Sequence, residues 1–188
     1  MWIITPKTLL TAAEQQQVTE HFLQLDPQDR RLRFGLVVSD QFIVQYVSMA
    51  LADPHSEMFV IFDQGSVAAA GHVAVVNSEG ELGVSVLPGY RGSGMASALF
   101  DRAVSYLRMH NATTVYMHCL RENRVIQHIA QKNHMQVLTD QNESDARLSI
   151  AAPTPLTVYH ETRATRMAIA DMLLRHHAKV FMKLWGLA

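Results

Sequence analysis

The stretch Val86-Leu-Pro-Gly-Tyr-Arg-Gly-Ser-Gly-Met-Ala96 decides how this chain folds. Its proline and glycines separate an apolar, β-rich run at 82–86 from a run with helical periodicity at 95–109. The chain is therefore predicted to leave a strand, turn sharply and enter a helix. The start of a helix exposes backbone N–H groups without partners, and Gly92 and Gly94 carry no side chain that would block an approaching anion. The turn therefore suits a phosphate group.

Two known phosphate-binding sequences do not fit this turn. A P-loop requires a lysine after its glycines, and a dinucleotide-binding fingerprint requires a third glycine where this chain has Ser97. Arg91 would still add a positive charge beside a bound phosphate. The residues alone leave two alternatives, an anion-binding loop and an ordinary strand-to-helix connection whose glycines serve tight packing.

Composition and charge narrow the class of protein. The chain has 188 residues, of which 48% are apolar and 18% charged, as in a globular rather than a disordered protein. We find no apolar run long enough for a membrane span and no secretory signal, and the single cysteine, Cys119, fits a reducing cytoplasm. The net charge of −1 argues against a nucleic-acid partner. We expect a cytoplasmic protein with one domain at 1–150 and a C-terminal extension at 151–188.

Periodicity and turn residues predict the order of helices and strands. The turns between the apolar runs from 58 to 86 are short, which predicts an antiparallel meander. The charged segment 29–34 fits either a solvated loop or the border of a substrate groove. Together the elements predict a mixed α/β sheet with helices on both faces. We expect helices at 12–25, from Ser39 to about Ala50, at 94–109 and at 123–132, and strands at 2–4, 58–62, 67–76, 82–86, 114–120 and 136–139, with less definite strands near 146–151 and 156–159.

The C-terminal extension has the pattern of a basic amphipathic helix. We expect its apolar stripe to pack on the domain or on a second copy in a homodimer. The alternative is contact with an anionic membrane surface or an acidic partner, with Phe181 and Trp185 as apolar anchors. The stripe consists of Ile169, Met172, Leu173, His176, Val180 and Leu184, and the basic row of Arg175, Lys179 and Lys183.

Two segments of the chain resemble the GNAT N-acetyltransferases. Arg91-Gly-Ser-Gly94-Met-Ala96 is similar to the family's Arg/Gln-x-x-Gly-x-Gly/Ala signature, and Leu120-Arg-Glu-Asn123-Arg-Val-Ile126 is similar to its asparagine-containing segment. The resemblance covers about residues 81–138. It implies the GNAT acyl-CoA N-acyltransferase fold, with acetyl-CoA as cosubstrate. It also implies transfer of the acetyl group to a primary amine, of a protein lysine or of a small molecule, by direct attack in a ternary complex.

The resemblance also implies where acetyl-CoA binds. Backbone groups near Val84 and Val86 would pair with the pantetheine arm, in a slot that opens because this strand splays away from the strand at 115–119. Asn123 would lie near the pantetheine, or would act only as the N-cap of its helix. The pyrophosphate would lie on the turn formed by Arg91, Gly92, Ser93, Gly94, Met95 and Ala96.

The same resemblance suggests catalytic residues. Glu81, where the family often carries a glutamate, would be the general base, although a solvent-facing turn would show the same residue. His118 is a second candidate, on a strand face that looks either into the cleft or into the core. The family's tyrosine acid is replaced by Ala130, and its Gly-Phe pair by His134-Met135. The chain therefore resembles most the glutamate-dependent, protein-lysine acetyltransferase-like branch, which commonly lacks that tyrosine. The alternative is a catalytically silent acyl-CoA-binding module.

Other reactive side chains give weaker signals. His176 and His177 are adjacent rather than four residues apart, and the remaining histidines show no ligand spacing, so we expect no metal site. Cys119 has no base on its own strand face and is expected to be an inert thiol.

Overall fold

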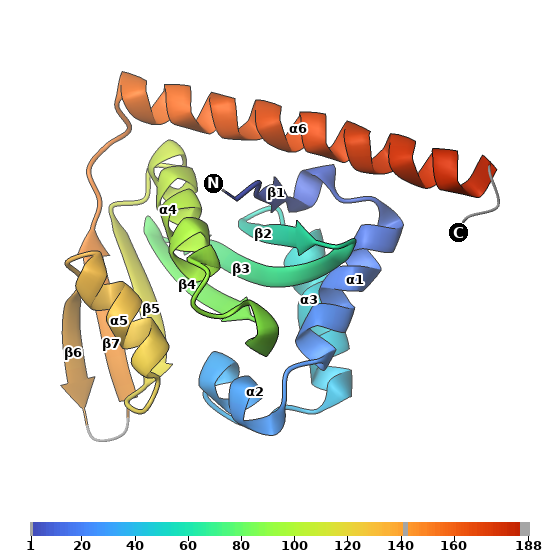
Figure 1. The fold of residues 1–188 in the computed structure, drawn as a ribbon. Helices are drawn as coiled ribbons and strands as arrows, with labels where there is room; N and C mark the ends of the chain where they lie inside the picture. The colour runs from blue at the N-terminus through green and yellow to red at the C-terminus, as the bar shows by residue number, and fades with distance from the viewer. Residues whose placement is uncertain (1, 141–142, 185–188) are drawn as a thin grey trace.

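The computed structural model describes residues 2–140 and 143–184, which form a seven-stranded sheet with helices packed against it (Figure 1). The mixed α/β fold expected from the sequence is confirmed. The helices are α1 (Ala12–Leu23), α2 (Pro27–Phe34), α3 (Asp40–Ala52), α4 (Met95–Met109), α5 (Arg124–Lys132) and α6 (Pro155–Leu184), with 3-10 turns η1 (Lys7–Leu9) and η2 (Pro88–Tyr90). The strands are β1 (Thr5–Pro6), β2 (Ser56–Asp63), β3 (Ser66–Val76), β4 (Glu79–Val86), β5 (Thr114–Leu120), β6 (Gln136–Asp140) and β7 (Glu143–Ser149).

The strand order β1-β2-β3-β4-β5-β7-β6 divides the sheet into two antiparallel groups. The first group runs from β1 to β4 and confirms the predicted meander. The second consists of β5, β7 and β6. The groups join where Glu79–Glu81 of β4 pair in parallel with Thr114–Tyr116 of β5. In the described strands this pairing ends at Glu81, so the sheet is split between the C-terminal parts of β4 and β5.

Apolar side chains on the two faces of the sheet form two cores. Along β2, Met58 and Val60 point into one core, whereas Phe59 and Ile61 point into the other, as the alternation of a strand requires. The helices that cover these faces are amphipathic, as predicted. Leu99, Ala103 and Leu107 of α4 and Ile129 of α5 pack on one face, and Val18 and Phe22 of α1 and Ile43 and Val47 of α3 pack on the other.

The segment 29–34 is helical, so its interpretation as a solvated loop is wrong. Asp26 caps α2 by accepting a hydrogen bond from the Asp29 amide at 2.7 Å, and Pro27 occupies the first turn. Gly35, with a φ of 80°, ends the helix in the left-handed conformation that favours glycine. These are ordinary helix boundary signals, and they enclose a segment whose charge suggested a loop.

Three predicted strands differ from the structure. The first strand lies at Thr5–Pro6 rather than at 2–4, and the strand predicted near 146–151 spans Glu143–Ser149. Residues 156–159 form the first turn of α6 instead of a strand. The Thr154 hydroxyl accepts from the Thr157 amide at 3.2 Å, and Pro155 suits the first position of a helix. This helix start outweighs the β-branched composition of the segment.

The long helix α6 crosses one end of the sheet and contacts α4, β1 and η1 (Figure 1). The predicted apolar stripe is not its buried face, since Ile169 is 39% and Leu173 49% exposed. The buried face instead carries small and charged side chains. Glu161 pairs with Arg102 of α4, and the Arg175 Nε lies 3.0 Å from Glu14 Oε1 of α1. The helix therefore docks largely through ion pairs, which an apolar pattern does not reveal.

Part of the prediction for the C-terminus falls outside the described residues. Trp185 is one of these, and the side chains of Lys179, Val180, Phe181, Lys183 and Leu184 are likewise not described. The membrane-surface and homodimer interpretations of α6 therefore stay predictions. Within 2–140 and 143–184, no helix combines the length and the apolar character that a bilayer span needs.

Candidate functional site

A cleft of about 570 Å³ lies where β4 and β5 separate. Most of the residues that the sequence predicted for acetyl-CoA binding line it. The exceptions are Ser93 of the turn and the two catalytic candidates, Glu81 and His118. The predicted residues that do line the cleft are Val84, Val86, Arg91, Gly92, Gly94, Met95, Ala96 and Asn123.

The glycine-rich turn at one end of the cleft presents free backbone amides. Gly92 and Gly94 have φ values of 75° and 84°, in the left-handed region, while a Cβ on either would meet nothing within 4 Å. Backbone conformation, rather than crowding, therefore requires glycine here. Gly94 is the N-cap of α4, so no side chain caps the first amides of this helix. These amides and the helix dipole suit a phosphate group.

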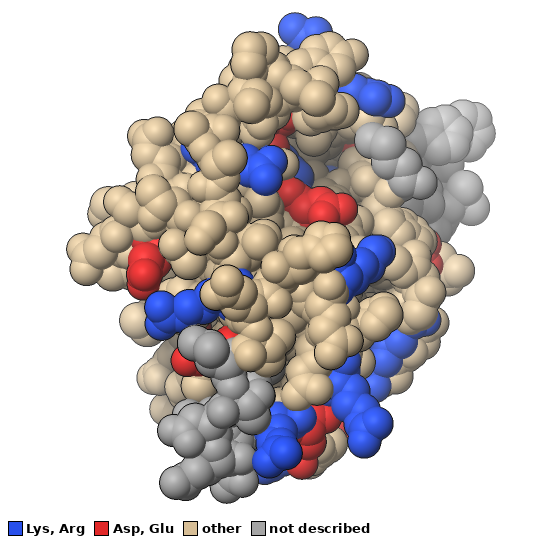
Figure 2. Space-filling model, turned by 90° about the vertical axis from the view of Figure 1, so that its left-hand side faces the viewer, with Lys and Arg blue, Asp and Glu red and all other residues tan. Residues whose placement is uncertain are grey.

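Basic side chains of α5 line the same cleft, and the sequence analysis missed them. Arg124, His128 and Lys132 follow one another at four-residue spacing, which places them on one face of the helix. Lys132 Nζ lies 3.4 Å from Ser97 Oγ in the first turn of α4. Their four-residue spacing is the sequence signal that could have identified this basic face of α5. Figure 2 views the side of the molecule on which α5 lies and shows basic side chains interspersed with acidic ones there.

Helix α2 bridges the two sides of the split in the sheet. On the β4 side, Asp29 Oδ2 lies 2.6 Å from the Arg91 Nη2. On the β5 side, the Asn123 amide donates to the Leu32 carbonyl oxygen at 3.1 Å. Because Asp29, Leu32 and Arg33 line the cleft, the segment 29–34 borders it, which was the second of the two predicted alternatives.

The Asn123 side chain is held by two hydrogen bonds within the protein. Its Oδ1 accepts from the Ile126 amide at 3.2 Å, which makes it the N-cap of α5, and its Nδ2 holds α2 as described above. Asn123 is buried, with 6% of its surface exposed. Its contribution in this structure is therefore to position α5 and α2 at the cleft, as the N-cap alternative predicted in part.

The two catalytic candidates lie near the point where the strands part. Glu81 and Tyr116 are the last paired residues of β4 and β5, and the Tyr116 hydroxyl donates to Glu81 Oε2 at 3.3 Å. Burial and the Glu81 carboxylate raise the pKa of Tyr116, so the phenol keeps its proton. His118 lies further along β5, with its Nδ1 2.7 Å from Asp145 Oδ1 of β7. Both Glu81 and His118 are exposed, so this face of the strands is not core.

A buried histidine supports β4 beside the cleft. His21 Nδ1 lies 3.0 Å from the Val67 carbonyl oxygen, and its Nε2 lies 2.7 Å from the Ser85 hydroxyl. Burial lowers the pKa of His21 to about 4, so the ring is neutral near pH 7. A carbonyl only accepts, so Nδ1 carries the proton and Ser85 donates to Nε2. No spacing in the sequence links these residues, which lie in α1, β3 and β4.

The positions at which the chain departs from the GNAT pattern have a structural role. Ala130 is completely buried in the core beneath α5. His134 has a φ of 55°, the left-handed conformation that a glycine adopts at a helix end, and Met135 enters the core beside it. The replaced Gly-Phe pair therefore keeps its turn and its apolar contact, whereas Ala130 itself carries no hydroxyl in place of the tyrosine.

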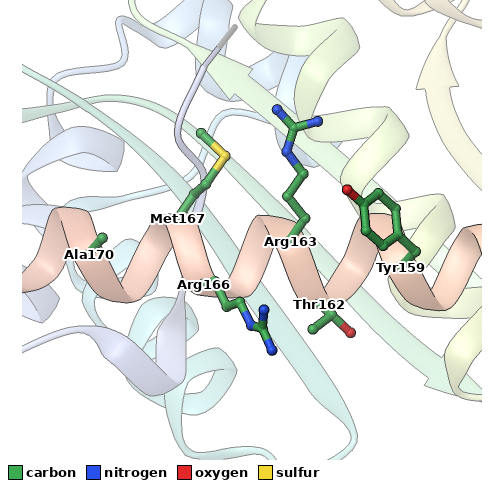
Figure 3. Close-up of a pocket in the computed structure, with 6 residues that line it drawn as sticks. All are labelled: Tyr159, Thr162, Arg163, Arg166, Met167 and Ala170. Carbon is green, nitrogen blue, oxygen red and sulfur yellow. The ribbon is translucent and has the colours of Figure 1, made fainter.

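A second hollow, of about 450 Å³, lies on the outward face of α6 (Figure 3). This helix alone lines it, and it includes no residue of the turn, the split strands or α5. The cleft between β4 and β5 is therefore the candidate functional site. In the described part of the chain, no cluster of three or more histidine, cysteine, aspartate or glutamate side chains could hold a metal ion. The lining of the second hollow consists of Tyr159, Thr162, Arg163, Arg166, Met167 and Ala170.

Comparison with solved structures finds the same fold in several acetyltransferases. The GNAT domain of PAT from S. lividans has a TM-score of 0.67 at 13% identity, over 78% of this chain and 89% of that one. The spermidine N-acetyltransferase of Vibrio cholerae, in complex with CoA and spermine, has a TM-score of 0.63 at 16% identity, over 78% and 95%. The ribosomal-protein-S18-alanine N-acetyltransferase of Escherichia coli has a TM-score of 0.59 at 16% identity, over 82% and 97%.

Sequence comparison adds the family itself. No curated protein sequence matches the chain significantly. The model of the acetyltransferase (GNAT) family, however, matches residues 8–135, which contain the meander, the glycine-rich turn, α4 and α5. This match covers more than half of the chain and includes the whole cleft between β4 and β5. The chain therefore belongs to the GNAT family of acetyltransferases.

Proposed function

We propose that this enzyme transfers the acetyl group of acetyl-CoA to a primary amine by direct attack in a ternary complex, with Glu81 as the general base. The observation that carries the proposal is the place of Glu81. It is the last residue of β4 that pairs with β5, so its carboxylate lies where the split opens. An acetyl group held in the split would lie within reach of this carboxylate.

The donor side of the cleft fits acetyl-CoA. Between Leu82 and Val86, β4 pairs with no described strand on the side of the split, so backbone groups near Val84 and Val86 would be available to the amides of the pantetheine arm. The amides from Gly92 to Ala96 would hold the pyrophosphate. The basic row on α5 supplies positive charge for the remaining phosphate of the nucleotide.

The residues present allow a simple reaction. Glu81 would accept a proton from the ammonium form of the acceptor, directly or through one water molecule. The neutral amine nitrogen would then form a bond to the thioester carbon while the C–S bond breaks and the sulfur leaves as thiolate. The nitrogen would release its second proton to water, and the thiolate would take up a proton from that water, which leaves the neutral amide and the thiol. Tyr116 orients the Glu81 carboxylate through its hydrogen bond. Holding both substrates in one cleft supplies much of the rate.

Replacement of Glu81 by glutamine tests this assignment. We expect kcat to fall by about 100-fold or more, because a general base contributes that much, while the Kd for acetyl-CoA stays within about twofold. Glu79→Gln is the matched control, since Glu79 lies two residues earlier on the same exposed face of β4. Turnover can be followed by thiol release and binding by calorimetry. An unchanged kcat in the Glu81→Gln variant would remove Glu81 from the mechanism.

The class of acceptor does not follow from the fold. Among the enzymes with this fold, one is named for a ribosomal-protein alanine and another for spermidine. The protein-lysine acetyltransferase-like branch therefore stays a prediction, which rests on the absence of a tyrosine at Ala130. A panel of lysine peptides, polyamines and amino acids, assayed by thiol release, would decide among these acceptors.

A second candidate function is an acyl-CoA-binding module without turnover. Ala130 favours it, because an alanine cannot serve as the acid that the family's tyrosine supplies at this position. This candidate predicts that acetyl-CoA binds while no amine in the panel releases thiol. It also predicts that Glu81→Gln changes neither quantity.

A further inference from the structure

Arg33 differs from the other two arginines of α2. Arg30 lies 2.7 Å from Asp40 Oδ1, and Arg31 pairs with Glu122. Arg33 has no carboxylate partner in the described part of the chain, and it is the arginine of the three that lines the cleft. A half-buried guanidinium without a counter-charge, facing a substrate cleft, is a candidate for binding an anion.

The surroundings of Arg33 fix its guanidinium in one place. It lies beside the rings of Phe22, Phe34 and Tyr46, with Cζ 5.9, 5.0 and 5.5 Å from the three ring centroids. Its Nη2 donates to the Tyr46 hydroxyl at 2.6 Å, whereas its Nε is buried without a partner. The arginine is therefore oriented before any ligand arrives, which reduces the entropy lost on binding.

The backbone of β4 is shaped to accept this guanidinium. A Cβ at Gly83 would meet the guanidinium carbon and both terminal nitrogens, so only glycine leaves room for the group to lie flat on the strand. Gly83 and Glu81 point to the same face of β4, about 7 Å apart. A positive group and a negative group thus flank the point where the strands part.

The remaining groups on this wall do not neutralise Arg33. Burial and the Arg33 charge lower the pKa of His72 to about 4, and burial together with Arg33 does the same for His21, so both rings are neutral near pH 7. Burial raises the pKa of Tyr46, which keeps its proton. The wall therefore carries a positive charge, and the Glu81 carboxylate lies on the same face of β4.

We propose that Arg33 binds a carboxylate of the acceptor, so the acceptor is a small, amino-acid-like molecule that carries a carboxylate close to its amine. The ammonium group of such a molecule would face Glu81 while its carboxylate accepts from the Arg33 guanidinium. The inference rests on the proposed function, because it places the amine at the base assigned above. Helix α2 favours a small acceptor, because it contacts Arg91 on one side of the split and Asn123 on the other and so covers the split.

The test compares acceptors that differ only in the carboxylate. A panel of amino acids and their carboxamides would be assayed with acetyl-CoA, and the ratio of the two kcat/KM values gives the preference for the carboxylate. We expect the native enzyme to prefer the carboxylate, and Arg33→Met to reduce this ratio by about 10- to 100-fold, as for the loss of a hydrogen bond to a charged group. Arg33→Lys, which keeps the charge but not the planar fork, should give an intermediate ratio.

Arg31→Met is the matched control, because it removes the same charge from the same helix without touching the cleft. The ratio should stay as in the native enzyme, and circular dichroism with thermal unfolding shows whether each variant is folded. If Arg33→Met does not fold, the inference is still tested by the kcat/KM ratio of Arg33→Lys and by the preference of the native enzyme for the carboxylate. Equal kcat/KM for acids and carboxamides in the native enzyme, or faster acetylation of lysine peptides, would overturn the inference and leave the acetyltransferase function standing.

Two further outcomes separate the inference from the proposed function. A rise in the Kd for CoA in the Arg33→Met variant, measured by calorimetry, would assign Arg33 to the donor site and would also overturn the inference. If no acceptor releases thiol although CoA binds, the proposed transferase function and the inference about Arg33 both fail. Carboxylate-dependent turnover that is lost in Arg33→Met, with an unchanged Kd for CoA, supports both.

Discussion

Protonation of His21 is expected to destabilise the folded protein, because this neutral ring is completely buried between α1 and the sheet. The Val67 carbonyl fixes its single proton on Nδ1, and the hydroxyl of Ser85 occupies Nε2. A second proton would have to enter at Nε2, where it would displace the proton that Ser85 donates. It would also place a charge in an apolar core.

The magnitude follows from the pKa. A histidine in the unfolded chain titrates near pH 6.5, whereas burial lowers the pKa of folded His21 to about 4. Between these values the unfolded chain binds a proton that the folded chain does not. The contribution of His21 to the free energy of unfolding is therefore complete above pH 6.5 and is lost as the pH falls toward 4. At about 1.4 kcal/mol per pH unit, this interval corresponds to about 3 kcal/mol.

Urea unfolding in a series of buffers across this interval would measure the effect. His21→Asn keeps a donor for Val67 but does not titrate, so its free energy of unfolding should fall with decreasing pH by up to about 1.4 kcal/mol per unit less steeply than that of the native protein. Some slope should remain, because burial also lowers the pKa of His72 to about 4. His177→Asn, on the exposed face of α6, is the control. Equal slopes for native protein and His21→Asn would refute the reasoning.

Three other substitutions test separate parts of the structure. Lys132→Ala removes a charge from the α5 row and should raise the Kd for acetyl-CoA by about 3- to 10-fold at low salt, and by less at high salt, as titration calorimetry would show. Gly80→Ala would bring a Cβ against the fully buried Leu107, so the free energy of unfolding in urea should fall by about 1–3 kcal/mol. An unchanged free energy of unfolding would mean that the Leu107 side chain repacks without cost. Arg175→Met leaves the 3%-exposed Glu14 without its ion-pair partner, so the free energy of unfolding should fall by about 3 kcal/mol. Glu14→Gln in the same chain should restore part of this loss. Equal stability of all variants would show that α6 does not depend on this pair.

The central part of the fold was predictable because its signals are local. The apolar runs of β2, β3 and β4 are joined by short turns, and the capping box of Thr11 and Glu14 fixes the start of α1. The glycines at 92 and 94 likewise indicate the turn before α4. In each case a few neighbouring residues decide the conformation.

Helix α2 was only half predictable for the opposite reason. Its boundary residues, Asp26, Pro27 and Gly35, are clear signals, but its interior is too charged to suggest burial. The contacts that settle its place involve Arg91 and Asn123, which lie far away in the sequence. Local pattern cannot show contacts of this kind.

The docking face of α6 was wrongly predicted because it is not apolar. The residues that hold it are charged partners such as Glu161 and Arg175, together with small residues such as Ala168. A search for an apolar stripe selects Ile169 and Leu173 instead, and these are exposed. The basic row of α5 was overlooked for a similar reason, since three polar residues on a short helix suggest a solvated face.

Helix α2 connects the glycine-rich turn with the part of the cleft that carries Arg33. Asp29 pairs with Arg91 beside the glycine-rich turn, and Arg33, a turn further along the same helix, lies against Gly83 of β4 and lines the cleft. A phosphate that draws Arg91 away from Asp29 would release one end of α2 and shift the other. The free energies of donor and acceptor binding are therefore expected to be non-additive, with each substrate changing the affinity for the other by the same factor.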